Sequence, residues 1–236
     1  MREMILKRCL WLSAALTLLA VAMGVAGPKR DRDLPYRYDS PLIALQMAED
    51  RQQVEKVVDP KDSGRRAGFR NHLLLDVVFL GAYGALFLHL GWALTLRPQR
   101  MARMFGRLAM VGAVLSAALD LGENWLMWNA INGGSFDALR TVALAKWAAV
   151  GATAFFIAPL FLPRLPLDGA IKLYAGVALF FFLLASATLI GGVWEARRHY
   201  PLEHAATPLG FAILAQAFCF STRRKREEFA AHQLDD

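Results

Sequence analysis

The sequence predicts an all-α membrane protein, a polytopic bundle of six transmembrane helices with an extramembrane amphipathic helix between the first and the second. Of its 236 residues, 56% are hydrophobic and only 20% are charged. That apolar fraction is high for a soluble domain. The apolar residues also gather in runs of about 20 with few charges, and each run is long enough to cross a bilayer as a helix.

The charge distribution indicates a lipid bilayer as the partner rather than nucleic acid. The formal net charge is +7, but the basic residues lie at the ends of apolar runs, where they act as topology signals. The two cysteines, Cys9 and Cys219, lie near the ends of the first and last runs. Cysteines so far apart make no disulfide or zinc framework, and we interpret them as small apolar fillers.

Residues 1–27 are predicted to form an N-terminal anchor helix. Arg2, Lys7 and Arg8 precede the apolar run that extends to Gly27. This arrangement also fits a secretory signal sequence, because the run ends in small residues that resemble a cleavage site. We favour a retained anchor, because further spanning helices follow it in the chain.

Residues 28–71 are polar and are expected to lie outside the cytoplasm. Ser40 followed by Pro41 is typical of a helix start, and Pro60 predicts that the helix ends at about residue 58. The apolar residues that share one face of this helix, 41–58, are Ile43, Met47, Val54 and Val58. We expect that face to rest on the bundle or the lipid headgroups, and the alternative is a surface that binds a protein partner.

Residues 72–222 are predicted to form a five-helix membrane bundle. In the first of its helices, Gly81, Gly84 and Gly91 would allow close contact with a neighbouring helix. The five apolar runs are 72–96, 108–131, 141–163, 171–194 and 204–220.

Basic residues predict the orientation of the bundle in a bacterial-type inner (plasma) membrane. Four arginines and no acid occupy 97–107, and the tail 223–236 begins with four consecutive basic residues. Cytoplasmic loops carry such an excess of positive charge, so both termini are expected in the cytoplasm. Lys29 and Arg65 are among the basic residues that run against this rule in the outer segment.

Ionisable residues inside the apolar runs predict a buried polar site. An ionisable group at the centre of a transmembrane helix costs about 2.5 to 3.5 kcal/mol on the insertion scale, so it usually faces the bundle interior and has a partner. The expected topology gives these residues one depth in the outer half of the bilayer, and we expect Lys146 to pair with an acid. The site would consist of Asp76, Asp120, Glu123, Asn124 and Lys146.

Helical spacing assigns an inner and an outer face to the third run. Ser116, Asp120 and Glu123 share a face that is mostly small or polar, whereas Val114 and Leu121 point the other way. The polar face should therefore look into the bundle and the apolar face should meet lipid.

Further polar residues are expected at the outer rim of this site. Three carboxylates against one lysine leave an imbalance, so one carboxylate should be protonated, paired at the rim or holding a cation. The candidate rim residues are His72, Tyr83, Arg140, Glu195 and His204.

Several function classes fit these features. The cluster could fasten helices in a structural or accessory subunit, with the apolar stretch 180–182 facing a protein partner, or it could bind a small molecule, a lipid or a proton. The alternative is a metal-assisted membrane hydrolase or lipid-modifying enzyme that uses the same carboxylates with His72 or His204. Because no HExxH, P-loop, Rossmann, Gly-x-Ser-x-Gly or CxxC motif occurs, we favour a non-enzymatic role and assign no cofactor, metal or catalytic residue.

Overall fold

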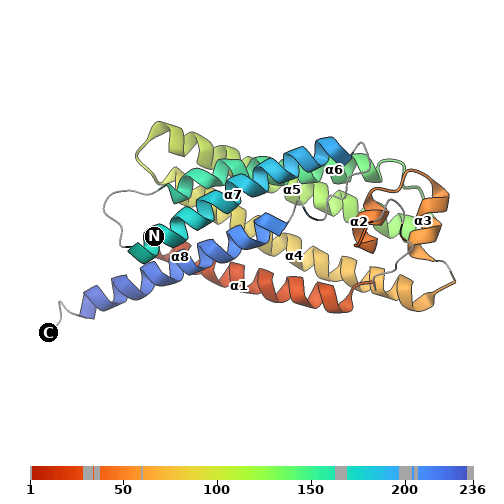
Figure 1. Ribbon diagram of the computed structural model, residues 1–236, viewed down its shortest axis with the longest axis horizontal. Helices are drawn as coiled ribbons and strands as arrows, with labels where there is room; N and C mark the ends of the chain where they lie inside the picture. The colour runs from red at the N-terminus through yellow and green to blue at the C-terminus, as the bar shows by residue number, and fades with distance from the viewer. Residues whose placement is uncertain are drawn as a thin grey trace.

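The computed structural model describes residues 2–28, 34, 38–59, 61–162, 169–196, 204 and 207–232, and this part of the chain is helical without strands. The long helices run lengthwise in an elongated bundle, and two short helices, α2 and α3, lie at one end (Figure 1). The elements are α1 (Arg2–Ala26), α2 (Pro41–Gln46), α3 (Arg51–Val58), α4 (Ser63–Thr95), α5 (Arg100–Ile131), α6 (Leu139–Ile157) with the 3-10 helix η2 (Ala158–Phe161), α7 (Gly169–Ala196) and α8 (Thr207–His232).

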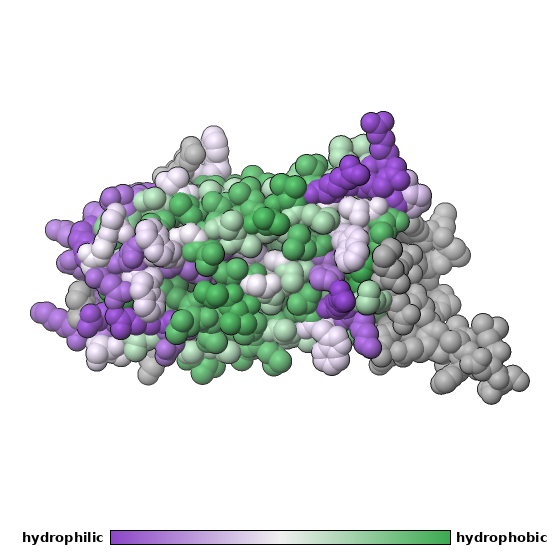
Figure 2. Space-filling model, turned by 180° about the vertical axis from the view of Figure 1, so that it is seen from behind, coloured by the Kyte–Doolittle hydropathy of each residue, from purple (hydrophilic) through white to green (hydrophobic). Residues whose placement is uncertain are grey.

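Five helices in the described part of the chain are long and apolar enough to cross a membrane. They correspond to α1, α4, α5, α6 with η2, and α7. The apolar part of α8, Thr207–Thr222, is shorter, so the predicted sixth span stays a prediction. On the face drawn in Figure 2, hydrophobic residues cover the middle of the molecule, between hydrophilic residues toward either end. These are the features of a multi-pass membrane protein.

The predicted single helix 41–58 is wrong, because the structure has two helices there. Ser40 caps α2, as expected, by accepting a hydrogen bond from the Ile43 amide at 3.5 Å. Asp50 then caps α3 by accepting from the Gln53 amide at 2.8 Å, which starts a new helix. The four apolar residues expected on one face, Ile43, Met47, Val54 and Val58, are all buried.

Glycines bring α4 and α5 into close contact at one place. A Cβ atom at Gly91 would lie 2.9 Å from the Gly106 carbonyl oxygen, and one at Gly106 would lie 2.6 Å from the Gly91 carbonyl oxygen. At Gly84 a Cβ atom would meet only the Ala117 side chain, at an ordinary 3.6 Å. Gly81 is exposed and a Cβ atom there would meet nothing within 4 Å, so the expectation of close contact was wrong for that residue.

A buried hydrogen bond joins the first and last helices. The Gln216 side-chain amide donates to the Ser13 hydroxyl at 2.6 Å, and this hydroxyl donates to the Cys9 carbonyl oxygen at 2.8 Å. Both side chains are almost completely buried, so α1 and α8 pack as parts of one bundle. Cys9 and Cys219 are buried and form no disulfide. The predicted basic tail starts inside α8, but the side chains of residues 223–232 lie outside the described part.

Candidate functional site

Helix α5 supplies three polar side chains to the interior of the bundle. Asp120, Glu123 and Asn124 follow one another at spacings of three and four residues, which places them on one face of the helix. All three are buried, and Glu123 is 0% exposed. Val114 and Leu121 on the opposite face are exposed, so the predicted division of this helix into an inner and an outer face is confirmed.

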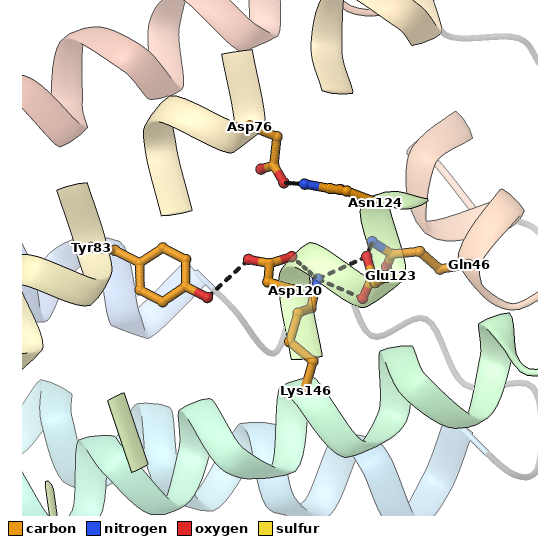
Figure 3. Close-up of polar contacts among 7 residues, drawn as sticks. All are labelled: Gln46, Asp76, Tyr83, Asp120, Glu123, Asn124 and Lys146. Atoms are coloured by element: carbon orange, nitrogen blue, oxygen red, sulfur yellow. Dashed lines mark hydrogen bonds and ion pairs between the residues drawn. The ribbon is translucent and has the colours of Figure 1, made fainter. Parts of the chain in front are cut away.

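Lys146 of α6 pairs with two of these acids. Its Nζ atom lies 3.3 Å from Asp120 Oδ1 and 2.8 Å from Glu123 Oε2 (Figure 3). The lysine is only 6% exposed, and its Nζ atom also lies 4.4 Å from the centroid of the Trp147 ring. The predicted pairing of Lys146 with Asp120 or Glu123 is confirmed, and both acids take part.

Helix α4 contributes Asp76 and Tyr83. The Asn124 side-chain amide donates to Asp76 Oδ2 at 2.6 Å, and the Tyr83 hydroxyl donates to Asp120 Oδ2 at 2.9 Å (Figure 3). Tyr83, which was expected at the rim, therefore belongs to the cluster itself. The structure thus brings together all five residues predicted for the buried site, from three different helices.

Gln46 of α2 also belongs to the cluster, although it was not among the predicted site residues. Its side-chain amide donates to Glu123 Oε1, and the residue is 1% exposed. Its own Oε1 atom has no hydrogen-bond partner. The signal in the sequence was a single polar residue in the otherwise apolar stretch 41–48. We refer below to Gln46, Asp76, Tyr83, Asp120, Glu123, Asn124 and Lys146 as the polar cluster.

A cavity of about 220 Å³ lies beside the polar cluster. Most of its wall is apolar, and its polar lining residues are His72, Trp147 and all members of the polar cluster except Asn124. Besides Glu123 Oε2, which is in an ion pair with Lys146, three of the lining residues have a buried polar atom without a hydrogen-bond partner: Gln46 Oε1, His72 Nε2 and Trp147 Nε1. The apolar wall is assembled from six helices and includes Met23, Ile43, Phe79, Phe87, Met127, Val150 and Ile213.

The other predicted rim residues differ in where they lie. His72 lines the cavity, whereas Arg140, Glu195 and His204 are not among the described residues that line it. Arg140 instead forms an ion pair with Glu49, in the connection between α2 and α3. His204 is exposed and Glu195 is half-buried.

The polar cluster places carboxylates, an ammonium group and side-chain amides next to one another in the interior of the bundle. Within the described ranges, no group of three or more His, Cys, Asp or Glu side chains is placed to hold a metal ion. Comparison of the chain with protein-family models, curated proteins and solved structures finds no match. The polar cluster and the cavity beside it are the features of the described residues that bear on function.

Proposed function

We propose that this membrane protein binds one small amphiphilic molecule, with its apolar part in the cavity and its polar group against the polar cluster. The observation that supports this proposal is the position of the cavity. Its wall is mostly apolar, and it also includes the buried ion pairs of Lys146 with Asp120 and Glu123. Small-molecule sites in proteins have this character, with mostly apolar walls and a few polar groups that fix orientation.

The volume of the cavity favours a binding site over a purely structural contact. Protein interiors are close-packed, and voids much larger than a water molecule are few. A cluster that only fastened helices would need no space of about 220 Å³ beside it. It would also satisfy its own polar atoms, whereas Gln46 Oε1 and Asn124 Oδ1 have no hydrogen-bond partner here.

A structural role is the second candidate, because the polar cluster links four helices, α2, α4, α5 and α6. Interhelical polar contacts in membranes average only about 0.6 kcal/mol, so fastening alone gains little from so many buried charges. An accessory subunit would also need a surface for its partner. Within the stretch 180–182, which was expected to face a partner, Phe180 is exposed. Phe182 is buried instead and stacks on Phe161, with the ring centroids 5.4 Å apart.

The metal-assisted hydrolase or lipid-modifying enzyme is the weaker alternative. It would use Asp76, Asp120 and Glu123 as ligands, but two of these carboxylates already face Lys146 at ion-pair distance. An ammonium group competes directly with a metal ion for the same oxygens. The described residues also offer no three-ligand group.

We place the binding site in the outer half of an inner (plasma) membrane, with α8 as the sixth span and both termini in the cytoplasm. The arginine-rich connection between α4 and α5 supports this orientation. The buried contact between Gln216 and Ser13 supports α8 as part of the membrane bundle. The lining residues Gln46 and Met23 lie toward the end of the bundle opposite that connection.

Filling the cavity tests the proposal. Ile213 lines the cavity, whereas its neighbour Leu214 is exposed on the surface of α8. We expect Ile213→Trp to exclude the bound molecule, because the indole occupies its space, and Leu214→Trp to leave binding unchanged. The measurement is mass spectrometry of small molecules and lipids that co-purify with each variant in mild detergent. Equal amounts in both variants, or none with the unmodified protein, would contradict a ligand-binding cavity.

A further inference from the structure

The polar end of the cavity has more acidic than basic side chains. Asp76, Asp120 and Glu123 all line it, and Lys146 pairs with the last two. Asp76 accepts a hydrogen bond from the neutral amide of Asn124 and forms no ion pair with a described cationic side chain. A buried carboxylate without a counter-charge is costly, and a proton or a bound cation removes that cost.

Aromatic rings also line the cavity. Phe79, Tyr83 and Phe87 follow one another along α4, with ring centroids 5.9 and 5.8 Å apart, and all three line the cavity. Trp147 of α6 lines it as well. The faces of aromatic rings attract cations within about 6 Å. The ammonium group of Lys146 over the Trp147 ring is one instance already present in the protein.

Two buried amide oxygens in the polar cluster lack a hydrogen-bond donor. Gln46 Oε1 lies on the cavity wall and Asn124 Oδ1 lies next to Asp76, and both side chains are at least nine-tenths buried. Of the two residues, Gln46 lines the cavity, and a ligand there with an N–H or O–H group would satisfy its Oε1 atom, whereas a carboxylate or an ether would not. The Trp147 Nε1 atom, a donor without a partner, could in turn bind an oxygen atom of the same ligand.

Resting on the proposed binding function, we infer that the polar group of the bound molecule is a protonated amine. Asp76 supplies its counter-charge, the Gln46 carbonyl oxygen accepts one N–H, and the rings of Phe79 and Tyr83 cover its remaining surface. A free single-chain amine and the ethanolamine headgroup of a lipid present the same ammonium group. The aromatic rings alone would also suit a quaternary ammonium, but that group has no hydrogen to donate to the unpaired Gln46 oxygen, whereas a protonated amine has.

Competition between ligands of equal chain length tests this inference. The full-length protein is placed in nanodiscs of phosphatidylcholine and phosphatidylglycerol, and saturable binding of tritiated octylamine is measured against protein-free discs. Unlabelled octylamine should compete, whereas octanol, octanoate and octyltrimethylammonium should compete roughly tenfold less well or worse, since charge-assisted hydrogen bonds need both the charge and the N–H. Discs that also contain phosphatidylethanolamine show which molecule supplies the ammonium group. If this lipid reduces octylamine binding, the ligand is the lipid headgroup, and if it does not, the ligand is a free amine.

Octylamine binding is then compared between variants of the polar cluster and a control variant outside it. Asp76→Asn should weaken octylamine binding by roughly tenfold or more, and Asp137→Asn, in the exposed connection before α6, should leave it unchanged. Gln46→Leu retains every charge and should also weaken binding, which keeps the test valid if Asp76→Asn folds poorly. If octanol or octanoate binds as well as octylamine and Ile213→Trp abolishes that binding, the amine inference is overturned while the cavity remains a site. If no probe binds saturably to the unmodified protein, the proposed function fails as well.

Discussion

Lys146 is the residue on which the buried charges depend. It lies between Asp120 and Glu123, so one ammonium group compensates two carboxylates in a region that lipid surrounds. Removal of one partner of a buried ion pair leaves an uncompensated charge, whereas removal of all partners can be neutral. The energetic role of this lysine is therefore testable separately from ligand binding.

Lys146→Met is expected to destabilise the protein by roughly 3–5 kcal/mol, because Asp120 and Glu123 lose their counter-charge. Thermal unfolding in detergent, followed by tryptophan fluorescence, measures the effect. Lys172→Met, at an exposed position of α7, is the matched control and should have little effect. The triple variant Lys146→Met, Asp120→Asn, Glu123→Gln should recover much of the lost stability. No recovery would mean that the lysine stabilises the bundle by packing and not by charge.

Most of the cluster could be predicted from the sequence, because an ionisable side chain inside a transmembrane helix avoids lipid and faces the interior of the bundle. The spacing of Asp120, Glu123 and Asn124 defines their common face, and the order of the helices brings Lys146 to the same depth. Gln46 could not be predicted in this way. It lies outside the membrane spans, and the tertiary packing of α2 alone decides that its amide turns inward.

At the scale of helices, the contact between α4 and α5 depends on backbone approaching backbone. Gly91 and Gly106 face each other where any side chain would meet a carbonyl oxygen. Small residues allow such close packing in membranes, where dispersion contacts and interhelical hydrogen bonds replace the hydrophobic effect. The sequence predicted close contact at all three glycines of α4, whereas only at Gly91 would an added Cβ atom come within 3 Å of a neighbouring helix. The prediction failed at the others because helix rotation depends on the neighbouring helices.

Gly91→Val should therefore separate α4 from α5 and destabilise the protein, at a cost of roughly 1–3 kcal/mol or more from overpacking. Gly81→Val is the matched control on the same helix, where a Cβ atom meets nothing within 4 Å. The midpoint of thermal unfolding should fall for the first variant and change little for the second. Similar midpoints for both would mean that the two helices are not in close contact at Gly91.

At the scale of the molecule, α1 begins and α8 ends at one end of the bundle, and α2 and α3 lie at the other (Figure 1). The long apolar helices and their order were predictable from hydropathy and length. The cavity was not, because its wall combines residues from helices as distant in sequence as α1 and α8. Arg140 illustrates the same limit, since its partner Glu49 lies in a connection whose path the sequence leaves open.

Cysteine labelling tests the predicted orientation. In a background with Cys9 and Cys219 replaced by alanine, Lys56→Cys reports on α3 and Met101→Cys on the start of α5, and both positions are exposed. A membrane-impermeant maleimide applied to intact spheroplasts should label the first variant, and should label the second only after permeabilisation. The opposite pattern would place the arginine-rich connection outside and reverse the proposed topology.

The ion pairs between neighbouring helices also bear on how the chain enters the membrane. Helix α5 carries two acids, and the base that compensates them arrives only with α6, after the short connection 132–138. Released into lipid alone, α5 would carry both acids without a counter-ion. We therefore expect the insertion machinery to retain α5 until α6 has been synthesised, so that the two helices leave it together as a hairpin.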